Sequence, residues 1–78
     1  MRQFTKAEAR TFFVKDGHRS MSDYRIAEFQ LEQKYLCMPP DVFYGAVQRV
    51  LNRDIFPHQL ITDKEFLLNE VRLKRAAQ

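Results

Sequence analysis

The chain has 78 residues, of which 45% are apolar, 29% charged and 13% aromatic, a composition typical of one small globular domain. No apolar run approaches the roughly 20 residues that span a bilayer, and a single cysteine excludes an internal disulfide. The first residues lack the apolar stretch of a signal peptide, so we expect a cytoplasmic protein without membrane contact. Thirteen basic and ten acidic side chains give a net charge of +3, which permits nucleic-acid binding without requiring it.

Two segments place a threonine three residues before a glutamate, which is the spacing of a helix-capping box. The pairs are Thr5 with Glu8 and Thr62 with Glu65. In such a box the threonine hydroxyl accepts from the backbone N–H of the glutamate, and the carboxylate accepts from the threonine N–H. The pattern therefore predicts that one helix begins at Thr5 and another at Thr62.

The first helix is expected to end near Lys15. Gly17 follows at a suitable distance to adopt the left-handed backbone that commonly closes a helix. The alternative is a β-hairpin between residues 12–15 and 18–21, turned by Asp16-Gly17, since Asp-Gly favours tight hairpin turns. The helix is preferred because His18 and the two residues after it form a poor strand.

Residues 23–38 follow Ser22, a favourable N-cap, and are predicted to form one helix that ends before Pro39. Apolar side chains fall on both of its sides. One stripe holds Tyr24, Ala27, Leu31, Tyr35 and Met38, and the other side holds Ile26, Phe29, Leu36 and Cys37. A helix with two apolar sides is central in a bundle or contacts a partner. Ile26 and Phe29 are therefore candidate partner contacts, with packing against the first or last helix as the alternative.

Residues 41–51 show the clearest amphipathic helix pattern, with Asn52 as its C-terminal stop. A connection over residues 53–61 follows, with a short extended piece around residues 59–61 as one alternative, and residues 63–76 are predicted to form the last helix. We thus expect residues 1–78 to form one all-α domain of about four short helices. Its predicted core contains Phe12, Leu31, Tyr35, Phe43, Val47, Val50, Phe66 and Val71.

Catalytic and metal-binding patterns are missing from the sequence. Cys37, His18 and His58 are the only soft metal ligands, and they are not at finger-like spacings. There is no glycine-rich phosphate loop, nucleophile elbow or His-Glu helix motif. We therefore expect a protein without enzymatic activity, metal or cofactor.

DNA binding by a helix-turn-helix is an alternative. Residues 28–36, a turn over 37–40 and residues 41–52 have roughly the lengths of that motif. The outer face of the second helix offers Gln48, Arg49 and Asn52, residue types that read base edges. Phosphate contacts would come from other parts of the chain, namely from Arg2, Lys6, Arg10, Arg19 or the C-terminal tail. The same face is equally typical of the solvated side of an amphipathic helix.

Two segments resemble a family of small phage and prophage proteins of unassigned function. They are Phe4-Thr5-Lys6-Ala7-Glu8-Ala9 and Val50-Leu51-Asn52-Arg53-Asp54-Ile55-Phe56-Pro57-His58-Gln59-Leu60. Arg53, Phe56 and His58 match the family pattern. Three residues depart from it, namely Asp54, Pro57 and Gln59. The resemblance implies a phage-like origin, where chains of this size bind and divert a host protein. Inhibitors of host defence, including anti-CRISPR proteins, belong to that class.

The partner surface is expected on the third predicted helix. Tyr44, Gln48 and Arg49 lie opposite its apolar face, and Arg53 follows nearby. Aromatic and arginine side chains dominate protein interfaces. We therefore predict that these four residues contact a host protein, while self-association is left open.

Overall fold

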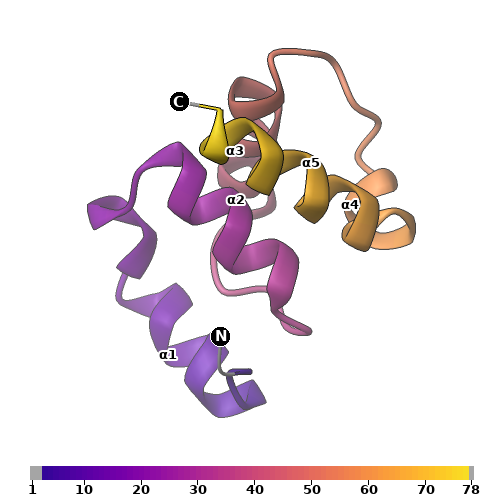
Figure 1. The fold of residues 1–78 in the computed structure, drawn as a ribbon. Helices are drawn as coiled ribbons and strands as arrows, with labels where there is room; N and C mark the ends of the chain where they lie inside the picture. The colour runs from indigo at the N-terminus through magenta and orange to yellow at the C-terminus, as the bar shows by residue number, and fades with distance from the viewer. Residues whose placement is uncertain (1–2, 78) are drawn as a thin grey trace.

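The computed structural model describes residues 3–77, and these form α-helices and one 3-10 helix without any strand (Figure 1). The predicted all-α fold is confirmed. The elements are α1 (Lys6–Val14), η1 (Gly17–Ser20), α2 (Asp23–Glu32), α3 (Pro40–Leu51), α4 (Gln59–Thr62) and α5 (Lys64–Ala76). The radius of gyration is 11.8 Å, close to the roughly 11.5 Å expected for a compact chain of this length.

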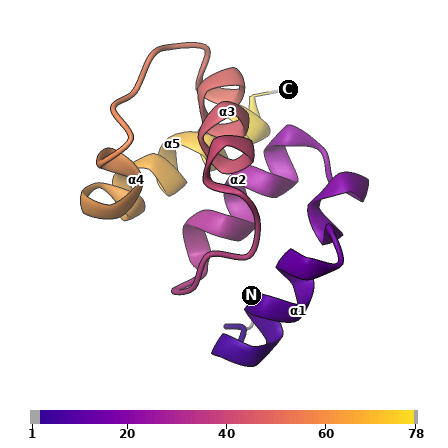
Figure 2. The same cartoon turned by 180° about the vertical axis from the view of Figure 1, so that it is seen from behind.

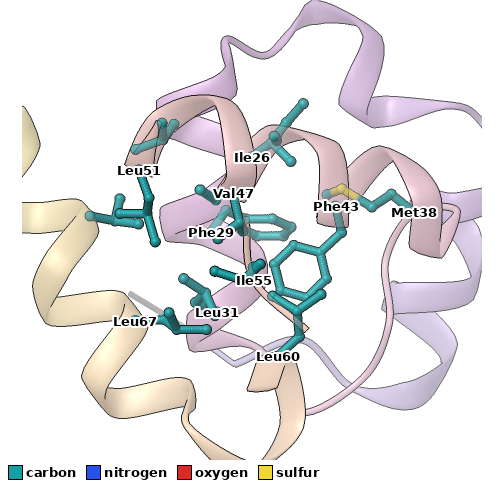
Figure 3. Close-up of a cluster of buried hydrophobic side chains, with 14 of the residues drawn as sticks. Ile26, Phe29, Leu31, Met38, Phe43, Val47, Leu51, Ile55, Leu60 and Leu67 are labelled. Atoms are coloured by element: carbon teal, nitrogen blue, oxygen red, sulfur yellow. The ribbon is translucent and has the colours of Figure 1, made fainter. Parts of the chain in front are cut away.

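The α2 helix lies at the centre, packed against α3 on one side and α5 on another (Figures 1 and 2). The chain itself covers both apolar sides of α2, because Phe4 and Phe12 also pack on Phe29. Side chains from α2, α3, α5 and the connections meet in one core (Figure 3). Of the predicted core, Leu31, Phe43, Val47, Val50 and Val71 are buried, and Phe12 and Tyr35 are half-buried.

The Thr5 capping box is confirmed at the start of α1. The Thr5 hydroxyl accepts from the Glu8 N–H at 3.2 Å, and the Glu8 carboxylate accepts from the Thr5 N–H at 2.9 Å. Two rings hold α1 to the core, because Phe12 of α1 and Phe4, which precedes the helix, both contact Phe29 of α2.

The chain leaves α1 through a 3-10 turn, so the hairpin alternative is wrong. Asp16, rather than Gly17, adopts the left-handed backbone with φ of 53°. Gly17 instead lies close to the Phe12 ring. A Cβ placed on it would lie 2.6 Å from a ring carbon of Phe12, so a larger residue would require that ring to move.

The α2 helix ends at Glu32, six residues before the predicted end at Met38. Gln30 explains the early end, because its buried side chain binds the backbone beyond the helix. Its Nε2 donates to the Tyr35 carbonyl at 2.9 Å, and its Oε1 accepts from the Cys37 N–H at 2.8 Å. Residues 33–39 therefore take an irregular path, in which the Gln30 side chain satisfies the Tyr35 carbonyl and the Cys37 N–H instead of helix hydrogen bonds.

The second predicted capping box is absent, so this prediction is wrong. Thr62 is the last residue of α4, and its hydroxyl donates to the His58 carbonyl at 3.1 Å. Asp63 precedes α5 without a side-chain cap. In α5, Leu67 lies in the core (Figure 3) whereas Phe66 is 68% exposed, which corrects the assignment of Phe66 to the core.

Ion pairs connect the helices around this core. The acidic residues of α2 face arginines from α3 and α5. The pairs are Asp23 with Arg49, Glu28 with Arg75 and Glu32 with Arg72, and Arg53 pairs with Glu70 of α5. None of the helices within residues 3–77 is long and apolar enough to cross a membrane.

Candidate functional site

A surface hollow of about 500 Å³ lies beside the start of α3 and is lined mainly by apolar side chains. We refer to it as the α3–α4 groove. Three stretches of chain contribute its walls: the end of α2 with the loop after it, the first turn of α3, and residues 57–64. The lining residues are Gln30, Lys34, Leu36, Pro40, Asp41, Phe43, Tyr44, Pro57, Leu60, Ile61 and Lys64.

Side-chain hydrogen bonds to backbone fix the relative positions of these walls. Lys64 Nζ donates to the Gln33 carbonyl at 2.6 Å and so joins the start of α5 to the loop after α2. The Tyr44 hydroxyl donates to the Ile55 carbonyl, which holds the connection after α3 against that helix. Because each of these bonds joins segments distant in sequence, the groove is a product of the tertiary fold.

Two apolar side chains on the groove are strongly exposed. Ile61 is 79% exposed and Leu36 is 43% exposed, whereas Phe43 and Leu60 beneath them are buried (Figure 3). The groove thus has a buried apolar floor and apolar side chains at its edge. Exposed apolar surface gathered around a hollow is typical of sites that bind another molecule.

Lysine and aspartate side chains supply the charge of the groove. Lys34 and Asp41 are exposed, while Lys64 is half-buried. Burial lowers the pKa of the Lys64 amine from its ordinary value, because a charged ammonium is poorly solvated there. The carbonyl of Gln33 compensates in part by accepting a hydrogen bond from that amine.

The predicted contact residues on α3 are all engaged within the chain. Arg49 makes two hydrogen bonds to the Asp23 carboxylate, at 2.8 and 3.0 Å. Arg53 makes two to Glu70, at 3.1 and 2.7 Å. The Gln48 amide lies 3.4 Å from an oxygen of Asp54. Tyr44 is half-buried against the core and lines the α3–α4 groove. These side chains therefore have structural contacts within the chain, which the sequence pattern did not indicate.

Ile26 and Phe29 are not on the surface. They are 5% and 8% exposed, and Phe29 contacts the rings of Phe4 and Phe12 at centroid distances of 5.2 and 5.4 Å. The second apolar side of α2 is thus covered by the chain itself, as the alternative interpretation held. These two residues are therefore too buried to contact a partner.

The residues of the DNA-binding alternative are spread over two ends of the molecule. Gln48, Arg49 and Asn52 lie near the C-terminal end of α3, where they line a shallow polar hollow. Lys6 and Arg10 belong to α1 at the opposite end (Figure 2), and Arg2 lies outside the described residues. The turn before α3 also spans residues 33–39, longer than the three or four residues of a helix-turn-helix.

Within residues 3–77, no three potential ligands among histidine, cysteine, aspartate and glutamate come together as a metal site. Cys37 is fully buried, and burial raises the pKa of its thiol, which disfavours the reactive thiolate. His58 stacks on Phe56 at the surface, with 5.7 Å between ring centroids.

Sequence reasoning missed most of the α3–α4 groove. Residues 53–61 were expected to be a connection with a short extended piece around residues 59–61, but those residues begin the helix α4, and the segment contains Ile55, Leu60 and Ile61. The sequence signal for a binding surface here was the presence of several apolar residues in a short segment interrupted by Pro57. Leu36 was placed on a helix, and its position in an irregular loop depends on the contacts of Gln30.

No protein-family model matches the chain, and no match was found among curated proteins or solved structures. The α3–α4 groove is therefore interpreted from its own geometry. The similarity to small phage proteins stays a hypothesis based on the residues that carry it.

Proposed function

We propose that this protein is an interaction module that binds a partner protein through the α3–α4 groove. The observation that supports this proposal best is the hollow of about 500 Å³ with apolar walls and with Ile61 and Leu36 exposed beside it. Its size suits one or two apolar side chains of a partner, since ligand pockets generally measure about 300–1,000 Å³. Burial of such anchors supplies most of the binding energy in protein interfaces.

The proposed partner is a host protein in the cytoplasm of a bacterial cell. This part of the proposal rests on the resemblance of residues 4–9 and 50–60 to small phage proteins. A chain of 78 residues that covers a functional surface of a larger protein would block or divert it. Inhibition of a host defence system, as by anti-CRISPR proteins, is the proposed form of this activity.

Binding is proposed rather than catalysis because Gln30, Tyr44 and Lys64, three of the polar side chains that line the groove, already hydrogen-bond to the backbone. The amine of Lys64 already donates to the Gln33 carbonyl. DNA binding has less support than protein binding. Arg49 on the proposed reading face and Arg53 beside it are each held by a carboxylate, and a paired cation neutralises fewer phosphates.

The test is affinity capture from bacterial lysate with the wild-type chain and two matched variants. Ile61→Glu places a charge on the groove, and Leu73→Glu places the same charge on α5 at a residue that is 71% exposed and lines none of the hollows described. We expect Ile61→Glu to reduce recovery of the partner by about tenfold or more. Leu73→Glu should retain full recovery.

Nuclease treatment separates the two candidate functions in the same experiment. If recovery requires nucleic acid and falls steeply with salt, DNA binding replaces protein binding as the function. If recovery is resistant to nuclease but identical for wild type and Ile61→Glu, the groove is not the binding surface. Circular-dichroism melting of each variant serves as the folding control, because both replaced side chains are exposed.

A further inference from the structure

A second apolar hollow adjoins the α3–α4 groove. It measures about 390 Å³ and lies between α1 and the loop after α2, and we refer to it as the α1 hollow. Its lining residues are Lys6, Ala9, Arg10, Phe13, Val14, Tyr35 and Leu36. Leu36 lines both hollows, so the two hollows meet at this residue, which we refer to as the ridge. The apolar surface is therefore continuous from α1 across Leu36 to α4.

The position of α1 beside this loop is fixed by polar contacts at its start. The Phe4 N–H donates to the side-chain oxygen of Gln33 at 2.8 Å. The Lys34 N–H donates to the side-chain oxygen of Gln3 at 3.0 Å. Because Lys64 holds the same loop from the other side, the two hollows are built on one shared segment, residues 33–36.

Positive charge surrounds this continuous surface. The two hollows are lined by four cationic side chains, those of Lys6, Arg10, Lys34 and Lys64, against one carboxylate, that of Asp41. Lys6, Arg10 and Lys34 are exposed. The arginines of α3 and α5 are instead paired with carboxylates of the chain. The surface thus presents apolar floors beside accessible cations.

We propose that the two hollows together bind one acidic amphipathic segment of a partner protein, laid across Leu36. Its apolar side chains enter both hollows, and its aspartates and glutamates face the lysines and Arg10. Charge complementarity of this kind raises association rates and excludes partners of the wrong sign. The apolar floors favour a protein segment over a nucleic acid, which would require a more continuous stripe of cations. This inference rests on the proposed function and specifies the chemistry of the partner.

The test begins with selection of peptides from a random displayed library on the immobilised wild-type chain. We expect the selected sequences to combine bulky apolar residues with aspartate or glutamate. The tightest peptide is then measured by titration against Leu36→Glu at the ridge, Arg10→Glu in the α1 hollow and Lys34→Glu in the α3–α4 groove. Each change should weaken its binding by about tenfold or more.

Matched controls separate the local effect from a change in net charge. Lys74→Glu and Leu73→Glu alter α5 residues that are exposed and line neither hollow. Their affinity for the peptide should stay within about twofold of the wild-type value. Equal loss in Lys74→Glu and Lys34→Glu would show a nonspecific charge effect and overturn the inference.

The remaining outcomes distinguish this inference from the proposed function. If Lys34→Glu and Ile61→Glu weaken peptide binding but Arg10→Glu does not, the α3–α4 groove binds the peptide alone. The inference then fails, while the proposed function stands. Selected peptides that are neutral or basic also overturn it. Binding unaffected by both Leu36→Glu and Ile61→Glu contradicts both proposals. Displacement of the peptide by duplex DNA or RNA, dependent on Arg10 and Lys34, would assign the surface to nucleic acid.

Discussion

The side chain of Gln30 provides the Cys37 N–H with the acceptor that a continued helix would otherwise have provided. Gln30 is 3% exposed, and its Oε1 accepts from the Cys37 N–H at 2.8 Å, seven residues along the chain. Its Nε2 donates to the Tyr35 carbonyl. One buried amide thus binds the backbone on both sides of Leu36, at the Tyr35 carbonyl and at the Cys37 N–H. Leu36 is the ridge between the two hollows.

Replacing Gln30 by methionine keeps the approximate shape but removes both hydrogen bonds. The Cys37 N–H is then buried without a partner, so we expect the free energy of unfolding to fall by about 1–3 kcal/mol. Urea denaturation measures the change. Gln48→Met is the control, because the Gln48 amide makes a long, exposed hydrogen bond of 3.4 Å to Asp54. Its loss should change the free energy of unfolding by less than about 0.5 kcal/mol. Equal stability of the two variants would contradict the role given to Gln30.

The two threonines that share a capping-box spacing are expected to differ in their contribution to stability. Thr5 caps α1, and replacing it with alanine should lower the free energy of unfolding by about 1 kcal/mol. Thr62→Ala should change it by less than about 0.5 kcal/mol, since that hydroxyl only donates back to the His58 carbonyl within α4. Chemical denaturation of both variants measures the difference. A larger loss for Thr62→Ala would support the capping box predicted from the sequence.

Substitutions of two neighbouring residues test which face of α5 packs against the core. Leu67 is fully buried and Phe66 is 68% exposed. Leu67→Ala leaves a cavity in the core and should cost about 2–5 kcal/mol of unfolding free energy. Phe66→Ala should cost less than about 0.5 kcal/mol, because it removes a surface side chain. Thermal melting ranks the two, and the opposite order would mean that α5 presents its other face to the core.

The stability of the fold should decrease in acid through two ion pairs. Hydrogen bonds from Arg49 and Arg53 lower the pKa values of Asp23 and Glu70 below their ordinary values of 3.8 and 4.5. Between the lowered and the ordinary values the unfolded chain binds more protons than the folded one. Stability therefore rises with pH through this window and is lost as pH falls through the lowered pKa values.

Melting temperatures measured from pH 7 down to the acid limit of folding test this dependence. The double variant Asp23→Asn with Glu70→Gln should show a flatter profile below about pH 4.5 than the wild type. Arg49→Gln with Arg53→Gln should flatten it similarly, since the carboxylates then lose their partners. An unchanged slope in both double variants would show that these pairs contribute nothing to the acid transition.

The sequence determined those features that depend on residues close together in the chain. The Thr5 capping box needs only Glu8 three residues later, and α3 follows from its own apolar periodicity, which places Phe43, Val47 and Val50 on one face. The all-α class follows from the same local signals. These features were predicted correctly because their hydrogen bonds and their apolar face lie within one helix.

Only the tertiary structure decided where α2 ends and what its second apolar side contacts. Periodicity continues to Met38, but Gln30 binds the backbone of the loop, and α1 brings Phe4 and Phe12 against Phe29. Spacing alone also cannot separate Thr5 from Thr62, because α4 occupies the position where the second cap was expected. The α3–α4 groove has the same origin, since Lys64 and Tyr44 hold segments that no local pattern brings together.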